Sequence, residues 1–109
     1  MVGVRGDVVL VKAANPGSQP VTLTSWGFLL PNGSTLVTVM NVVDGTVRLP
    51  YRLGPGDNCM HWMERSEIAK VLLRDGFRQQ RVELVAFYSD ALDIKYKSKA
   101  MRFDLTKYL

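Results

Sequence analysis

Three residues with soft or ionisable side chains alternate along one short segment: Cys59, His61 and Met63. Residues two apart in a β-strand point to the same side, so a strand here would bring the three side chains onto one face. Thiolate, imidazole and thioether are the ligands of blue-copper sites. Such a site needs two imidazoles, and His61 is the only histidine of the chain. We therefore expect no metal and interpret the segment as a strand, with the choice of buried face left open.

A nucleophilic Cys59 would need a general base within hydrogen-bonding distance. His61 shares the predicted face, but the two Cβ atoms would be about 7 Å apart, judging from the rise of two residues along a strand. The sequence also contains neither a phosphate-binding loop nor a dinucleotide-binding fingerprint. We expect no catalytic residue, no cofactor and no small-molecule substrate, and we predict that the protein is not an enzyme.

Basic side chains gather near the C-terminus. Residues 93–109 carry five basic and two acidic side chains, and so hold most of the net charge of +4. Lys95, Lys97 and Lys99 alternate, so a regular strand would present three ammonium groups on one face, with Arg102 close by. One interpretation is a surface that binds nucleic acid or another polyanion. The other is an outer strand whose lysines discourage pairing with a further strand.

Residues 35–43 have the opposite character, because none of them is charged and most favour β-structure. An open sheet edge of this composition would invite pairing with another chain. The strand is therefore either fully buried or covered by a second chain. We predict self-association or binding of a protein partner through a contact formed by Trp26, Val37, Val39, Met40 and Tyr51.

Turn signals separate the elements that would position these residues. Clusters of Pro, Gly, Asn and Asp recur at close intervals, and the runs between them are rich in Val, Leu, Thr and aromatic residues. The runs that predict strands are residues 7–14, 21–30, 35–43, 46–49, 57–64, 81–88 and 92–103. A turn at Ser89 and Asp90 would join the last two. Within residues 21–30 the apolar positions change parity near Ser25, which predicts a β-bulge.

One short helix is expected near residues 66–75. Ser66 is a residue type that caps helix N-termini, and Ile68, Val71 and Leu72 follow at helical spacing. Gly76 then provides the residue that commonly ends a helix. A helix this short needs a surface to pack on, so we expect it to lie against the sheets.

Length and composition fit one soluble domain spanning residues 1–109. A chain of 109 residues that is 47% hydrophobic can bury a single core. No apolar run approaches the roughly 20 residues that cross a bilayer, and the first residues do not form a signal peptide. The single cysteine is typical of a reducing compartment. We expect a cytoplasmic protein without membrane association.

Brief strands that reverse at short intervals, with one helix, predict an all-β fold. We expect an immunoglobulin-like antiparallel β-sandwich of about seven strands with one short α-helix. The single Cys59 excludes the disulfide of antibody domains.

Several turn and core motifs support this fold. The string Asn15-x-Gly17-x-x-Pro20-Val21-x-Leu23-x-Ser25-x-Gly27-Phe28 resembles one found in small, largely uncharacterised bacterial immunoglobulin-like domains. The resemblance extends to a later Leu-Pro and Leu-x-Pro-Gly segment, here Leu49-Pro50, Leu53 and Pro55-Gly56, and to a closing Tyr96-Lys97-Ser98 followed by Phe103. It implies a fold and assigns no catalytic residue.

The function expected from these observations is that of a non-enzymatic interaction or structural module. It would act through strand edges and apolar patches, by binding a protein partner or by forming a homo-oligomer. The alternative is binding of a polyanion or nucleic acid through Lys95, Lys97, Lys99 and Arg102.

Overall fold

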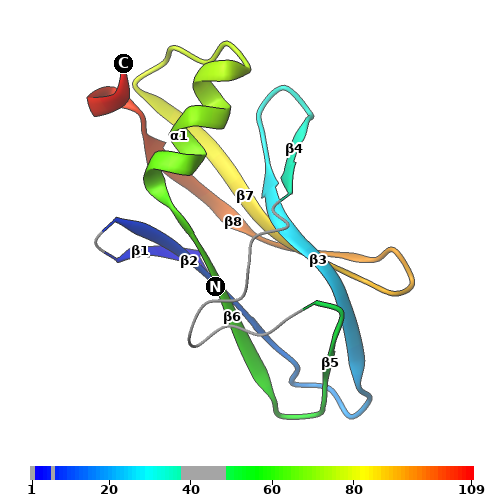
Figure 1. The fold of residues 1–109 in the computed structure, drawn as a ribbon. Helices are drawn as coiled ribbons and strands as arrows, with labels where there is room; N and C mark the ends of the chain where they lie inside the picture. Colours follow the sequence, from blue (N-terminus) through cyan, green and yellow to red (C-terminus); the bar gives the residue numbers. More distant parts are fainter. Residues whose placement is uncertain (1, 6, 38–48) are drawn as a thin grey trace.

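The computed structural model describes residues 2–5, 7–37 and 49–109, which form two antiparallel sheets (Figure 1). The smaller sheet has the strand order β1-β2-β6. The larger sheet has the order β4-β3-β7-β8, and β5 also pairs with β3. The strands are β1 (Val2–Arg5), β2 (Val8–Ala14), β3 (Val21–Leu29), β4 (Thr35–Val37), β5 (Tyr51–Leu53), β6 (Asn58–Glu64), β7 (Arg81–Asp90) and β8 (Lys95–Asp104).

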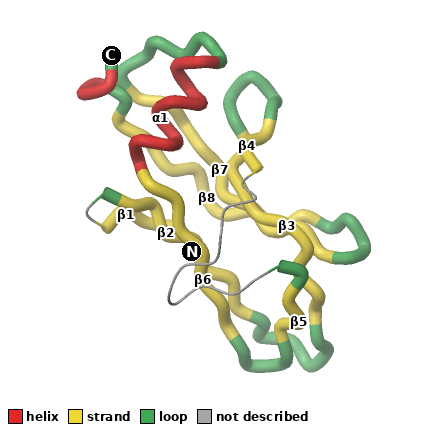
Figure 2. Tube along the Cα trace, viewed as in Figure 1, coloured by secondary structure: helices red, strands yellow, loops and turns green. Residues whose placement is uncertain are grey.

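The prediction of an all-β fold is confirmed, because strands account for most of the described residues (Figure 2). One α-helix, α1 (Arg65–Arg74), and a short 3-10 helix, η1 (Thr106–Tyr108), complete this part of the chain. One hydrophobic core joins both sheets and α1. Val9 of β2, Phe28 of β3 and Ile68 of α1 all lie in it with no exposed surface.

The inner face of the smaller sheet is the one that carries Cys59, His61 and Met63. All three side chains are buried, whereas Met60 and Trp62 between them are only half-buried. These three residues pair with Ala13, Val11 and Val9 of β2, which lie on the same face. The alternation predicted for this strand is confirmed, and the structure resolves which face is inside.

The register of β3 against β7 changes where the sequence predicts a bulge. Leu23 pairs with Asp90 and Ser25 with Ser89, so β3 contains one extra residue, Thr24, at this point. The Thr24 hydroxyl donates to backbone carbonyls of β7 at 3.2 and 3.3 Å. The bulge explains why the apolar positions of β3 change parity, since it turns the following residues to the other face.

The helix is confirmed, but its predicted start is wrong. Glu64, the last residue of β6, is the N-cap and provides no side-chain cap, so Ser66 lies inside the first turn. The C-terminal prediction is confirmed: Gly76 adopts a φ of +94°, and its amide donates to Leu73 while the amide of Phe77 donates to Leu72. This pair of bonds is a Schellman motif, which requires a residue that tolerates positive φ.

The hairpin between β7 and β8 differs from the prediction. Ser89 and Asp90, expected to form the turn, are the last residues of β7 and are buried. The reversal is made instead by residues 91–94, and β8 begins at Lys95. The register of β8 shifts between the partners Val85 and Phe87, so this strand also contains a bulge.

Of the uncharged run 35–43, residues 35–37 form β4, and residues 38–43 lie outside the described part. Within that part, β4 pairs with β3 and is the outermost strand on its side of the larger sheet. The strand predicted for residues 46–49 also lies outside the described part, apart from Leu49, which is not in a strand.

Candidate functional site

Cys59 and His61 lie between the two sheets, in a small polar cluster with Tyr88 of β7. The Nδ1 atom of His61 is 2.8 Å from the Tyr88 hydroxyl, and this hydroxyl donates to the Val11 carbonyl at 3.1 Å. The Tyr88 hydroxyl therefore lies within hydrogen-bonding distance of both the imidazole of β6 and the carbonyl of β2. The three groups thus link β6, β7 and β2 through the core.

The cluster favours the neutral forms of Cys59 and Tyr88. Burial raises the pKa of the Cys59 thiol, although hydrogen bonds with Tyr88 and the Ala13 backbone act in the opposite direction. Burial also raises the pKa of Tyr88 far above its ordinary value, and the neighbouring Cys59 adds to this shift. A protonated, buried thiol is a poor nucleophile, so this arrangement favours structure over catalysis.

Trp26 packs on the same cluster from β3. Its ring centroid is 5.3 Å from that of His61, and only 5% of the residue is exposed. The contribution of Trp26 to a partner contact stays a prediction, and its side chain packs within the core of the described chain. The described residues contain no group of three or more His, Cys, Asp or Glu side chains arranged to hold a metal ion.

The other residues predicted to form a contact are not brought together as a described surface. Val37 ends β4, whereas Val39 and Met40 lie outside the described residues. Tyr51 begins β5, opposite Leu23, and is half-buried against the core. The structure thus leaves Trp26 buried and Tyr51 half-buried.

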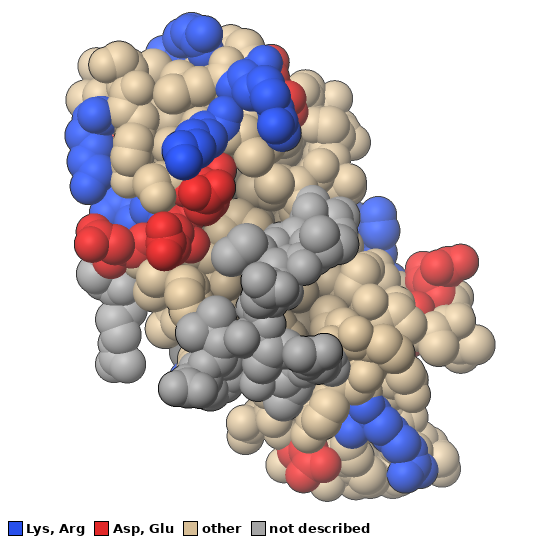
Figure 3. Space-filling model, viewed as in Figure 1, with Lys and Arg blue, Asp and Glu red and all other residues tan. Residues whose placement is uncertain are grey.

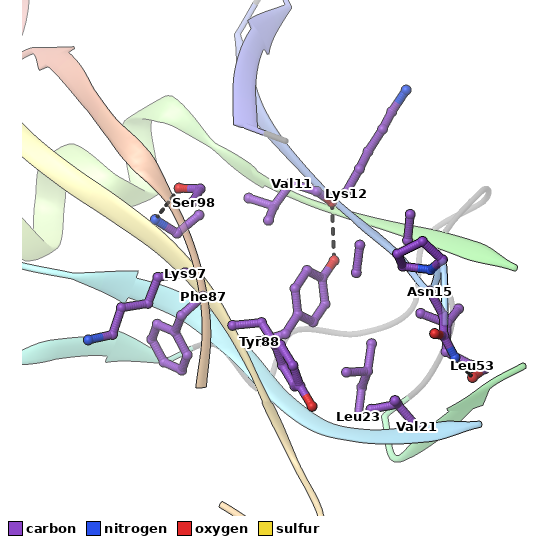
Figure 4. Close-up of a pocket in the computed structure, with 15 residues that line it drawn as sticks. Val11, Lys12, Asn15, Val21, Leu23, Leu53, Phe87, Tyr88, Lys97 and Ser98 are labelled. Atoms are coloured by element: carbon purple, nitrogen blue, oxygen red, sulfur yellow. Dashed lines mark hydrogen bonds between the residues drawn. The ribbon is translucent and has the colours of Figure 1, made fainter. Parts of the chain in front are cut away.

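A cavity of about 430 Å³ opens between the sheets, and neither Cys59 nor His61 lines it (Figure 4). Its walls come from residues 11–16 of β2 and the following turn, from residues 86–88 of β7 and from residues 96–98 of β8. Val21, Leu23 and Leu53 close the other side. The Asn15 amide on this wall is already bonded to the carbonyls of Gln19 and Leu53.

Next to the cavity, the β7–β8 hairpin presents three of the four large apolar side chains that are exposed in the described part of the chain. We call residues 91–94 the hairpin tip. Leu92 is 79% exposed and Ile94 49%, and Tyr96, which follows in β8, is 45% exposed. In Figure 1 the hairpin extends beyond β3, away from α1. Sequence reasoning missed this feature because it placed Leu92 and Ile94 in a strand and the turn at Ser89 and Asp90.

The buried carboxylate of Asp90 fixes the conformation of the hairpin tip. One of its oxygens accepts the amides of Leu92 and Ile94, both at 2.9 Å, and the other accepts the Tyr96 hydroxyl at 2.7 Å. The bond from Tyr96 and the two amide bonds hold the pKa of Asp90 below its ordinary value, against the effect of desolvation. The same carboxylate raises the pKa of Tyr96. An ionised Asp90 thus organises the whole turn.

The basic side chains of β8 are exposed but do not form one regular row. Three of these side chains lie opposite residues that share one face of β7: Lys95, Lys97 and Arg102. They therefore share the outer face of the larger sheet. The bulge falls between Lys97 and Arg102, and Lys99 lies at it, which breaks the predicted alternation. Lys95 places its ammonium 5.1 Å from the centroid of the Phe87 ring.

β8 is also the outermost strand on its side of the larger sheet, as far as the described residues extend. This position agrees with the interpretation of its lysines as edge protection. On the face shown in Figure 3, acidic and basic side chains lie beside each other at the end that carries α1, so both signs of charge meet there.

Neither helix in the described ranges has the length and apolar character required to span a membrane. In comparisons with known proteins, the chain matches no family model, no curated protein and no solved structure.

Proposed function

We propose that this chain is a non-enzymatic interaction module that associates with a second copy of itself through the hairpin tip. The observation that carries the proposal is the exposure of Leu92, Ile94 and Tyr96 around a turn that Asp90 holds in place. Neighbouring exposed apolar side chains on a monomer commonly mark a contact surface.

The rigidity of the turn favours this role. A turn that is already fixed loses little conformational freedom on binding, so more of the contact energy remains as affinity. The tip replaces residues 35–43 as the proposed surface. Trp26 is buried, Tyr51 is half-buried, and Val39 and Met40 lie outside the described residues.

An immunoglobulin-like topology remains part of the proposal. It is supported by two antiparallel sheets that share one core and by the resemblance of the turn and core motifs. A single, buried cysteine supports a reducing, cytoplasmic setting for the module.

Sedimentation velocity over a wide range of protein concentration tests the proposal. We expect the wild type to form dimers or larger species as concentration rises. The double variant Leu92→Ser/Ile94→Ser removes two large apolar side chains, each worth about 1.5–3 kcal/mol when buried. It should therefore weaken association about tenfold or more.

Leu109→Ser is the matched control, because Leu109 is 55% exposed but lies at the C-terminus, away from the tip. This variant should associate as the wild type does. A wild type that stays monomeric at the highest concentration, or a tip variant that associates unchanged, would remove the proposal.

A second candidate function is polyanion binding, which the exposed cations of β8 favour. The only ion pair among the described residues joins Lys70 and Glu67, so Lys95, Lys97 and Arg102 are not neutralised by a carboxylate there. Binding to heparin or a DNA oligonucleotide should then fall steeply with salt, and Lys95→Ala/Lys97→Ala should weaken it. Lys70→Ala is the control, and absence of salt-dependent binding would exclude this function.

A further inference from the structure

We propose that the cavity between β2 and the β7–β8 hairpin is the receptor for the hairpin tip of a second copy. The inference rests on the proposed self-association and names the site on the opposite molecule. Tip and cavity would then form a heterologous contact, in which two different surfaces of the same chain meet.

The lining of the cavity favours an apolar occupant. Val11, Val21 and Leu23 contribute aliphatic side chains, and the polar groups of Asn15 are already bonded within the chain. Among the described residues, the only buried side-chain polar atom without a partner is Nε of Arg65, which is not in the lining. No polar ligand group is therefore required to satisfy the walls.

The size of the cavity suits the apolar residues of the tip. A single large aliphatic side chain cut back to alanine can leave a cavity of about 150 Å³. A space of about 430 Å³ therefore has room for both Leu92 and Ile94. These two residues are 79% and 49% exposed in the monomer, so both have surface to bury.

Charged side chains do not occupy the cavity. The lining contains Lys12 and Lys97 and no acidic residue. Figure 4 shows both lysine side chains directed away from the Tyr88 ring, so their ammonium groups point away from the cavity. The tip carries the exposed Asp93 between its two apolar residues. Insertion of the tip would thus bury apolar side chains in an apolar space and leave the Asp93 carboxylate outside it.

The tip cannot fill the cavity of its own chain. Tyr96 and Lys97, which line the cavity, belong to the same hairpin and follow the tip directly. The bonds from Leu92 and Ile94 to Asp90 also hold the turn extended from the sheet. The occupant that fits both observations is therefore the tip of another molecule.

Complementation between two variants tests this assignment. Ala13 and Val21 line the cavity and are only partly buried, so Ala13→Phe fills the space while the tip stays intact. Leu92→Ser/Ile94→Ser removes the tip and leaves the cavity. Each variant alone should associate about tenfold or more weakly than the wild type. An equimolar mixture should form a 1:1 heterodimer, because one intact tip then meets one intact cavity.

Thermal melting verifies that each variant is folded, and Val21→Phe replaces Ala13→Phe if the latter is not. A folded cavity-filled variant that self-associates like the wild type would overturn the assignment but leave the proposed function standing. So would a mixture without heterodimer. A wild type that is monomeric throughout would instead remove the proposed function itself.

Discussion

The two ends of the β7–β8 pair differ in how they are covered. At one end, where β7 begins and β8 finishes, α1 and η1 lie close to the sheet (Figure 1), and Ile68, Leu72 and Leu105 have no exposed surface. At the other end the hairpin tip leaves Leu92 79% exposed. The same two strands thus carry a closed end that stabilises the fold and an open end that is available for binding.

The largest effect is expected at the closed end. Leu72→Ala removes a fully buried side chain from the contact between α1 and the core, and should lower the free energy of unfolding by about 2–5 kcal/mol. Urea denaturation followed by circular dichroism measures this loss. Leu92→Ala, the same change at the open end, is the control. Equal losses in the two variants would contradict the division between the ends.

Between the two ends, a substitution in the buried polar cluster should lower the free energy of unfolding by an intermediate amount. Tyr88→Phe removes the hydroxyl that bonds to the Val11 carbonyl and to Nδ1 of His61, which should cost about 1–3 kcal/mol of unfolding free energy. Tyr51→Phe is the matched control on a half-buried ring and should change stability much less. A Tyr88→Phe protein as stable as the wild type would mean that the hydroxyl does not link the sheets.

At the open end, the contribution of Asp90 to the free energy of unfolding should depend on pH. Its folded pKa lies below the ordinary value of 3.8, so its ionised form stabilises the folded state. This stabilisation is complete above the unfolded pKa and is lost as the pH falls through the folded pKa. The wild type should therefore exceed Asp90→Asn in stability at neutral pH, and the difference should vanish in acid.

Denaturation curves collected from neutral to acidic pH measure this difference. Tyr96→Phe removes the main cause of the lowered pKa, so it should reduce the pH-dependent part of the difference. If the difference in the free energy of unfolding between wild type and Asp90→Asn is the same at every pH, the charge of Asp90 plays no part in holding the tip.

The smallest effect on stability is expected at the tip itself. Leu92→Ser changes a side chain that is mostly in solvent, so the free energy of unfolding should change by about 0.5 kcal/mol or less. Thermal melting of dilute protein, where the chain is monomeric, provides the measurement. A large loss would indicate that Leu92 supports the fold, and the tip would then be a poor place to seek a binding surface.

Elements governed by local chemistry could be predicted from the sequence. Gly76 ends α1 because the Schellman motif demands positive φ, and this requirement is visible in the residue type. The bulge near Ser25 is visible because it changes the parity of the apolar positions. The start of α1 was mistaken because β6 leads directly into the helix at Glu64, where no local cap is used.

The hairpin tip could not be predicted from the same kind of signal. Ser89 and Asp90 are typical turn residues, but the tertiary fold buries them and extends β7 to Asp90. The carboxylate then bonds to the turn that follows it. The residue type indicates that an aspartate can accept bonds from turn amides. It does not indicate whether the turn precedes or follows the aspartate in the sequence.

The cavity is a still less local feature. Its walls come from β2, β3, β5, β7 and β8, and no segment of the sequence contains a pattern that specifies it. Small residues such as Ala13 and Ala86 leave space only because the fold brings these strands together. The residue types at Cys59 and His61 allow expectations about chemistry, but no residue pattern locates this space.

The most direct test of the contact between tip and cavity is a photo-cross-linking amino acid at position 92, with equal amounts of isotopically light and heavy chains. We expect mixed light–heavy cross-links from the tip to peptides that contain residues 11–16 or 96–98. The yield should rise with protein concentration and fall when Ala13 is replaced by Phe. If position 92 forms no cross-link between chains at high concentration, or reacts only with position 92 of its partner, the account is contradicted.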